Sequence, residues 1–238
     1  MLSARDRAMV ELVGRFRQLT ASQLGVALFA GQASKTPLDR TLKRLVERRY
    51  LARLARPVGG DGGGSAQYVY QLGRAGWRLL GTRGKYWPFR AVNLHALAVA
   101  DCFTSLAAAD RAGECALLRF DPEPACHVAV GAVTLTPDAY VEVGYRHRGV
   151  KLSVWLEVDR GTEHRETIKE KCVRYWRAYQ QWESEVFPSV VFVVPDEQRA
   201  RQIEQIIAGG PAEAQAIFDT GLFSTFTEVI RGIADRSP

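Results

Sequence analysis

The stretch WLEVDRGTEH, residues 155–164, ends a strand-like apolar run with two acids and leads into a helix-like segment. Side chains alternate faces along a strand, so Glu157 and Asp159 point to one side while Leu156 and Val158 point to the other. Two carboxylates on one face beside apolar neighbours require either a cation or open water. The stretch therefore predicts a polar site at the end of a buried strand.

Strand and helix patterns surround this stretch on both sides. The predicted strands are CALLRF (115–120), ACHVAVGAVTL (125–135), AYVEV (139–143), KLSVWLEV (151–158) and PSVVFVV (188–194). A helix over 162–183, with Thr162 as its N-cap, and another over 196–210 separate or follow the last strands. Strands that return after a crossing helix predict a mixed α/β sheet flanked by helices, in the α+β class.

A hairpin over residues 139–158 extends the acidic site. With its turn centred near His147 and Arg148, Asp138 falls opposite Glu157, and directly opposed residues have Cβ atoms about 4.5–5.5 Å apart on the same side. Asp138, Glu157 and Asp159 then converge at one edge of one face. Carboxylate oxygens suit Mg²⁺ or Mn²⁺, so the three acids predict a site for such a metal ion.

Two alternatives to a metal site follow from the same residues. A register shift of one residue would turn Asp138 to the other face of the sheet. Alternatively, Arg160 or Arg165 would neutralise the acids in a structural ion pair.

The charge of the chain is unevenly distributed. The net charge is +6 over 238 residues, but residues 1–90 hold 17 Lys and Arg against 5 Asp and Glu, whereas residues 91–238 hold 15 against 21. A basic N-terminal part joined to an acidic C-terminal part is typical of a nucleic-acid-binding module attached to a second domain.

The first ninety residues show the order of elements of a winged helix-turn-helix domain. Helical patterns at 4–16, 20–28 and 36–51 precede a strand, the glycine-rich turn GGDGGGSA (59–66), the strand QYVYQL and a short helix. The third helix would enter the major groove of double-stranded DNA and the wing would follow the phosphates. The predicted DNA-binding residues are Lys35, Arg40, Lys43, Arg44, Arg48, Arg49, Arg53 and Arg56. A protein-docking winged helix and an RNA-binding regulator are the alternatives.

Residues 89–113 predict one long connecting helix with a face of small residues, which suits either a bridge between the two halves or a homodimer contact. The predicted domains are therefore 1–88, 89–113 and 114–238. No apolar run reaches the roughly 18 residues of a membrane helix, and the charged N-terminus is unlike a signal peptide. The scattered cysteines indicate reduced thiols and a cytoplasmic location, and argue against a zinc ribbon.

The segments TPDAYVEV (136–143) and LSVWLEVDRGTEHRETIKEKCVRYWRAY (152–179) resemble the PD-(D/E)XK nuclease superfamily. Pro137 and Asp138 match the first half of its motif and Glu157 matches the acid of the second half. Asp159 stands where that motif has its lysine. In some members the lysine lies on the following helix, and Lys171 is the best substitute here because it lies nearer the inward helix face than Lys169.

Together with the N-terminal winged helix, the chain resembles the replication-relaxation family over roughly residues 15–195. The resemblance implies a bacterial protein of a plasmid or mobile element that acts in replication and DNA relaxation. It implies a restriction-endonuclease-like C-terminal domain in which Asp138, Glu157, Asp159 and Lys171 catalyse Mg²⁺-dependent cleavage or nicking, with replication or transfer proteins as partners. The alternative is an inactive nuclease-like scaffold or transcriptional regulator that binds DNA through the winged helix.

Overall fold

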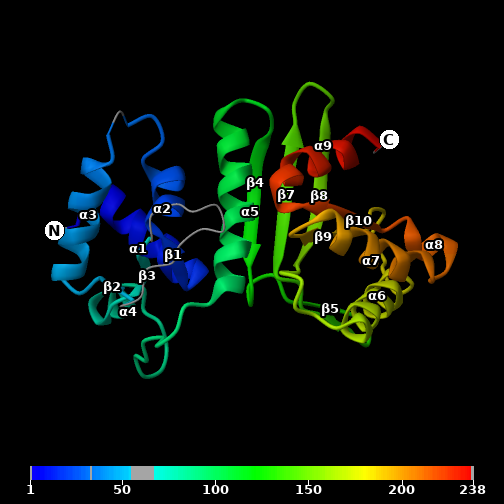
Figure 1. The fold of residues 1–238 in the computed structure, drawn as a ribbon, viewed down its shortest axis with the longest axis horizontal. Helices are drawn as coiled ribbons and strands as arrows, with labels where there is room; N and C mark the ends of the chain where they lie inside the picture. The colour runs from blue at the N-terminus through cyan, green and yellow to red at the C-terminus, as the bar shows by residue number, and fades with distance from the viewer. Residues whose placement is uncertain (1, 33, 55–66, 237–238) are drawn as a thin grey trace. The chain divides into compact units, whose positions relative to one another are not determined.

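The computed structural model describes residues 2–32, 34–54 and 67–236, which form two compact units, Met1–Thr104 and Ser105–Pro238 (Figure 1). The boundary falls within the long helix α5 (Leu94–Arg111), which lies inside the predicted connecting segment. The predicted α+β class is confirmed, because each unit combines helices with a sheet. Arg56 and the glycine-rich turn at 59–66 lie outside the described residues. No helix of the described part of the chain is long and apolar enough to cross a membrane.

The N-terminal unit consists of short helices packed on a small antiparallel sheet. Its elements are α1 (Ala4–Phe16), β1 (Gln18–Thr20), α2 (Ala21–Leu28), α3 (Thr36–Glu47), β2 (Leu51–Arg53), β3 (Val69–Leu72) and α4 (Arg74–Leu79). The strand order is β1-β3-β2, with both pairs antiparallel. Met9, Leu24, Leu45, Leu51 and Val69 form its buried centre. The sequence pattern predicts these helices and the strands β2 and β3, but not β1, whose three residues are too few to show a period.

Local capping explains where the first two helices begin. The side chain of Ser3 accepts a hydrogen bond from the backbone of Asp6, and Thr20 accepts one from Gln23, each within a reciprocal capping box. Helix α3 begins without a side-chain cap after Lys35, and Pro37 lies in its first turn. Its buried residues are Leu38, Thr41, Leu42 and Leu45, so the opposite side of the helix faces solvent.

The C-terminal unit is built on a five-stranded mixed sheet in the order β10-β9-β8-β7-β4. Its elements after α5 are β4 (Ala116–Pro122), β5 (Val128–Val130), β6 (Val133–Leu135), β7 (Ala139–Tyr145), β8 (Val150–Val158), α6 (Arg165–Tyr179), β9 (Ser189–Val194), α7 (Glu197–Ala208), α8 (Ala212–Gln215), β10 (Phe218–Leu222), a 3-10 turn (Phe223–Thr225) and α9 (Phe226–Arg236). Strands β8, β9 and β10 are parallel, whereas β4, β7 and β8 pair antiparallel.

The register of the β7–β8 hairpin is the one predicted. Tyr145 pairs with Val150 and Ala139 with Leu156, and the backbone N–H of Asp138 donates to the carbonyl of Leu156 at 2.9 Å. Continuing this register by one residue places Asp138 opposite Glu157. The alternative register, which would turn Asp138 away, is not the one formed.

Helices cover both faces of the sheet. The side chains of Trp155, Val190 and Phe192 belong to a core shared with α6 and α7. On the other face, α9 packs against β8 and β10 (Figure 1). A Cβ atom added at Gly221 would lie 2.6 Å from a methyl group of Val229, so the close approach of α9 to β10 requires glycine there.

Three sequence predictions differ from the structure in this unit. The strand predicted over 125–135 is two strands, β5 and β6, which pair only with each other and turn at Gly131 with a positive φ of 55°. The helix predicted from Thr162 begins at Arg165, with His164 as N-cap, because Asp159 draws the preceding loop into turns of its own. Strand β10 and helix α9 had no counterpart in the prediction.

Candidate functional site

The end of β8 and the inner face of α6 bring four polar side chains together. Lys171 Nζ lies 2.9 Å from Glu157 Oε2, and the Tyr175 hydroxyl donates to Glu157 Oε1 at 2.6 Å. Asp138, directly across the hairpin, accepts a hydrogen bond from the backbone N–H of Val158 at 2.7 Å. Lys171 and Tyr175 are four residues apart, so they lie on one face of α6 and both reach Glu157.

Burial controls the protonation of this group. Glu157 is only 3% exposed, and burial raises its pKa to about 7, with Lys171 acting to lower it and Asp138 to raise it. For Lys171, burial lowers the pKa but the carboxylates of Glu157 and Glu163 outweigh it, so the pKa is raised. Burial, reinforced by Glu157, raises the pKa of Tyr175 well above its ordinary value. The group therefore combines a permanently protonated lysine with a carboxyl group that titrates near neutrality.

Asp159 does not join this group, which corrects its prediction as a metal ligand and catalytic acid. Its Oδ2 atom lies 2.5 Å from Arg199 Nε on α7, and its Oδ1 accepts backbone N–H groups of Gly161 at 2.8 Å and Thr162 at 3.2 Å. Asp159 is 2% exposed. The alternative of a structural ion pair is therefore correct for this acid, but the partner is Arg199 rather than Arg160 or Arg165.

The loop between β8 and α6 is held from both sides by these ion pairs. Lys171 Nζ contacts Glu163 Oε1 at 2.7 Å, and Arg199 Nη2 donates to the backbone carbonyl of Glu163 at 2.7 Å. The second carboxylate oxygen, Glu163 Oε2, is buried without a hydrogen-bond partner among the described residues. A lysine from α6 and an arginine from α7 thus fix the same loop to the sheet.

This donor arrangement does not fit Mg²⁺ or Mn²⁺. Both oxygens of Glu157 already have partners, Tyr175 and Lys171, and one oxygen of Asp138 accepts a backbone N–H. Within the described ranges, no three His, Cys, Asp or Glu side chains are grouped closely enough to hold an ion. A divalent cation would have to displace the ammonium group of Lys171, which already supplies positive charge beside Glu157.

Two cysteines, Cys126 and Cys172, border the group. Cys126 Sγ donates to the carbonyl oxygen of Pro137 at 2.9 Å and so supports the residue before Asp138. Burial raises the pKa of both Cys126 and Cys172 to about 12, and the nearby carboxylates add to this effect. Both thiols therefore stay protonated at neutral pH.

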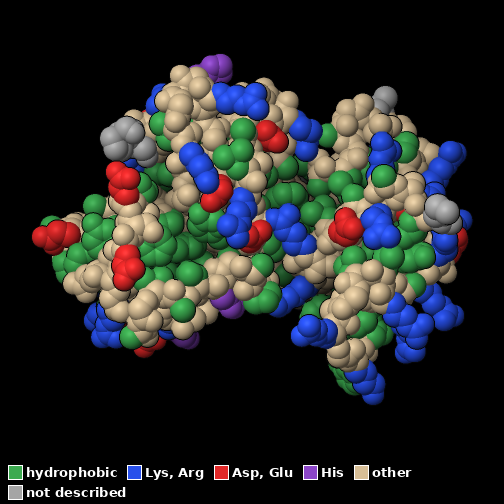
Figure 2. Space-filling view, turned by 180° about the vertical axis from the view of Figure 1, so that it is seen from behind, with side chains coloured by type: hydrophobic (Ala, Val, Ile, Leu, Met, Phe, Trp, Pro, Cys, Tyr) green, Lys and Arg blue, Asp and Glu red, His purple; other side chains and the backbone are tan. Residues whose placement is uncertain are grey.

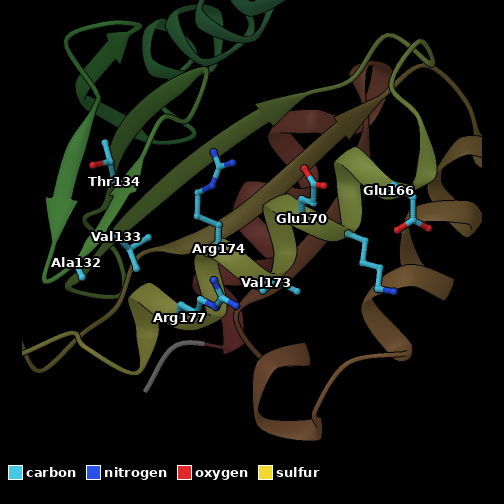
Figure 3. A pocket seen from close by; sticks show the side chains of 9 residues that line it. Ala132, Val133, Thr134, Glu166, Glu170, Val173, Arg174 and Arg177 are labelled. Atoms are coloured by element: carbon cyan, nitrogen blue, oxygen red, sulfur yellow. The ribbon is translucent and has the colours of Figure 1, made fainter.

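A separate pocket of about 520 Å³ lies on the opposite, outer face of α6 (Figure 3). Glu166, Glu170, Arg174 and Arg177 line it together with the β5–β6 hairpin. Its walls alternate in charge, and none of its lining residues belongs to the Asp138–Glu157–Lys171–Tyr175 group. The pocket therefore adds no donor to that group.

In the N-terminal unit, the predicted DNA-binding side chains that the structure describes are all exposed; they are Lys35, Arg40, Lys43, Arg44, Arg48, Arg49 and Arg53. Figure 2 shows Lys and Arg side chains gathered over this unit. Arg44 differs from the others because its guanidinium lies 2.6 Å from the buried carboxylate of Asp6 and ties α3 to α1. The remainder lie on α3, on β2 and on the residues next to α3.

Comparison with known proteins gives one match. The family model for replication-relaxation proteins matches residues 10–190 of the 238. The chain belongs to the replication-relaxation family. No curated protein and no solved structure matches this replication-relaxation protein. Family membership indicates a role in the replication of a plasmid or other mobile element.

The matched region contains Asp138, Glu157 and Lys171 but ends before Arg199. Sequence reasoning placed the first three together and missed both Tyr175, which it assigned only to the apolar face of α6, and Arg199. The spacing of Lys171 and Tyr175 was a usable signal for the first omission. Arg199 had no such signal, because helix α6, strand β9 and their connecting loops separate it from Asp159.

Proposed function

We propose that this replication-relaxation protein binds double-stranded DNA through its N-terminal unit and serves as a non-cleaving DNA-bound scaffold in replication of its element. The observation that carries the proposal is the two-sided character of α3. Leu38, Leu42 and Leu45 are buried on one side, and basic side chains are exposed on the other. A helix of this kind, followed by a β-hairpin, has the arrangement of a winged helix-turn-helix that presents its third helix to the major groove.

The basic side chains have distinct roles in this proposal. Arg40 and Lys43 lie on the exposed side of α3 and are the candidates for contact with base edges or phosphates. Arg44 positions α3 through Asp6 and contributes less to DNA directly. Arg48 lies over the ring of Tyr50 at 5.4 Å, which holds its exposed guanidinium in place, and it is a further candidate for a phosphate contact.

The C-terminal unit supports the scaffold role. Lys171 and Arg199 compensate the acids Glu157, Glu163 and Asp159, which ties β8, α6 and α7 together. Buried groups compensated in this way fix one arrangement of the elements around them. In this role the ion pairs of Lys171 and Arg199 stabilise the nuclease-like unit and take no part in phosphoryl transfer.

The DNA-binding part is tested by fluorescence anisotropy with a labelled duplex over a range of salt concentrations. Lys43→Ala is expected to weaken binding and to reduce the slope of log K against log salt by about 1, because one phosphate contact is lost. Lys169→Ala, an exposed lysine of the C-terminal unit, is the control and is expected to change neither quantity. A wild-type chain without measurable affinity for duplex DNA would overturn the proposal.

A metal-dependent nuclease is the second candidate, favoured by one observation. Lys171 reaches Glu157 from the helix that follows the strand, and Asp138 lies opposite Glu157, so an acid, a second acid and a lysine meet as in the nuclease motif. Supercoiled plasmid is incubated with wild-type protein, Asp138→Ala and Glu157→Ala in the presence of Mg²⁺ or Mn²⁺. Cleavage that both substitutions abolish would establish the nuclease, whereas intact plasmid bound by all three proteins agrees with the scaffold.

A further inference from the structure

The segment RGKYWPFR, residues 83–90, displays aromatic rings among basic side chains and has no part in the proposed function. Trp87 is 66% exposed and Phe89 is 46% exposed. Over residues 67–90 there are five Lys and Arg and no Asp or Glu. Exposed apolar side chains that lie close together, unlike single scattered ones, mark a contact with another molecule.

Residues on both sides of Trp87 are hydrogen-bonded to strand β3 of the N-terminal unit. The Tyr86 hydroxyl donates to the carbonyl of Leu72 at 3.2 Å. The Gln71 side chain accepts from the N–H of Phe89 at 2.8 Å and donates to its carbonyl at 3.0 Å. Trp87 is therefore presented on an ordered backbone, which lowers the entropy cost of using it for binding.

A basic pocket of about 430 Å³ adjoins this segment at Tyr86. Its lining residues are Val46, Arg49, Leu51, Ala52, Arg53, Gly73, Arg74 and Tyr86, so among the residues that the structure describes three arginines and no acid face it. The Arg53 guanidinium lies 4.0 Å from the ring centre of Tyr68, Arg74 lies 5.9 Å from that of Tyr86, and Arg90 lies 5.8 Å from that of Trp87. Arginines thus lie over aromatic rings at three places in and beside the pocket.

We propose that this surface binds an unpaired DNA strand, with bases stacked on Trp87 and Phe89 and backbone phosphate in the arginine pocket. Every base has a stacking face, but in a duplex that face is covered by the neighbouring base pairs, so exposed rings favour a single strand. The positive charge of the pocket complements phosphate, and an apolar protein partner would gain nothing from three arginines. This goes beyond duplex binding by α3, since Trp87, Phe89 and Arg74 belong to other elements.

The test compares a labelled twelve-nucleotide oligo(dT) with a twelve-base-pair duplex in anisotropy titrations of the full chain. Trp87→Ala is expected to raise the Kd for oligo(dT) roughly 5- to 100-fold, the range measured for loss of one stacked base. Trp87→Leu is expected to lose as much, because it keeps apolar area but no ring, whereas Trp87→Phe retains most of the affinity. Arg74→Ala is expected to weaken oligo(dT) binding and to reduce its salt dependence.

Controls separate this inference from the proposed function. Trp176→Ala removes a ring in the C-terminal unit that is stacked on Tyr179, and it is expected to leave the oligo(dT) affinity unchanged. The Trp87 variants are expected to bind the duplex as the wild type does, with circular dichroism melting confirming that they fold. An unchanged oligo(dT) affinity in Trp87→Ala, or full affinity in Trp87→Leu, would overturn the inference. The wild-type chain could bind oligo(dT) through Trp87 and yet fail to bind the duplex. That result would support single-strand binding and contradict the proposed function.

Discussion

Lys171 Nζ lies 2.9 Å from Glu157 Oε2, although the lysine comes from α6 and the acid from β8. Asp159, two residues after Glu157, is bound by Arg199 instead. The positive charge beside Glu157 therefore comes from the following helix and not from its own strand. Both ion pairs, Glu157–Lys171 and Asp159–Arg199, join separate elements, so their contribution to the free energy of unfolding can be measured.

Glu157 is expected to make folding stability depend on pH. Its pKa in the folded chain is raised from 4.5 to about 7, so its favourable contribution is fully present below pH 4.5 and is lost as the pH rises through 7. Glu157→Gln cannot titrate. The free energy of unfolding of Glu157→Gln minus that of the wild type is therefore expected to rise by about 3 kcal/mol across this interval. Urea titrations at several pH values measure it, and a constant difference would contradict the assignment.

Removal of the positive charge beside Glu157 is expected to be costly at high pH. Lys171→Met leaves a buried carboxylate with Tyr175 as its hydrogen-bond donor, and the loss is expected to be about 3 kcal/mol at pH 8. At pH 5 Glu157 is protonated and the loss is smaller. Lys169→Met, on the exposed side of the same helix, is the matched control. Equal losses for Lys171→Met at both pH values would show that the loss does not depend on the charge of Glu157, and would leave packing and the pair with Glu163 as its causes.

The Asp159–Arg199 pair is expected to hold α7 against the loop after β8. Arg199→Ala leaves a buried carboxylate without its cation and is expected to cost about 3 kcal/mol of unfolding free energy. Arg201→Ala, an exposed arginine two residues along α7, is expected to change it by no more than about 0.5 kcal/mol. The double variant Asp159→Asn/Arg199→Ala is expected to recover part of the loss. If it recovered none, the charge of Asp159 would not be the cause.

Two glycines of the C-terminal unit are expected to respond in opposite directions to alanine. A Cβ at Gly221 would lie 2.6 Å from Val229, so Gly221→Ala is expected to destabilise by about 1–3 kcal/mol through overpacking. Gly232 lies inside α9 with no atom within 4 Å of the added Cβ, and Gly232→Ala is expected to stabilise by up to about 1 kcal/mol. Thermal unfolding of both variants checks the pair, and a shift in the same direction would contradict the packing of α9 on β10.

The pairing of Asp138 with Glu157 could be predicted from sequence because it is a local relationship. Side-chain alternation and a turn near residue 147 determine the register of the hairpin, and no distant contact is needed. The inward face of α3 and the cap at Thr20 were predictable for the same reason. Strand β10 was not, because FDTGL has no alternation of its own and pairs as an edge strand only through β9.

Alternation along β8, the hairpin register and the two-sided charge of α3 were determined by the sequence alone, since each depends on neighbours within about one turn or one hairpin. The ion-pair partner of Asp159 was decided by the tertiary structure. Its local pattern is equally suited to a metal ligand and to an ion pair, and only the packing of α7 against the loop brings Arg199 within 2.5 Å. A buried charge must be compensated by an opposite charge that the fold places beside it. For Asp159 that charge belongs to Arg199, on an element that is distant in sequence.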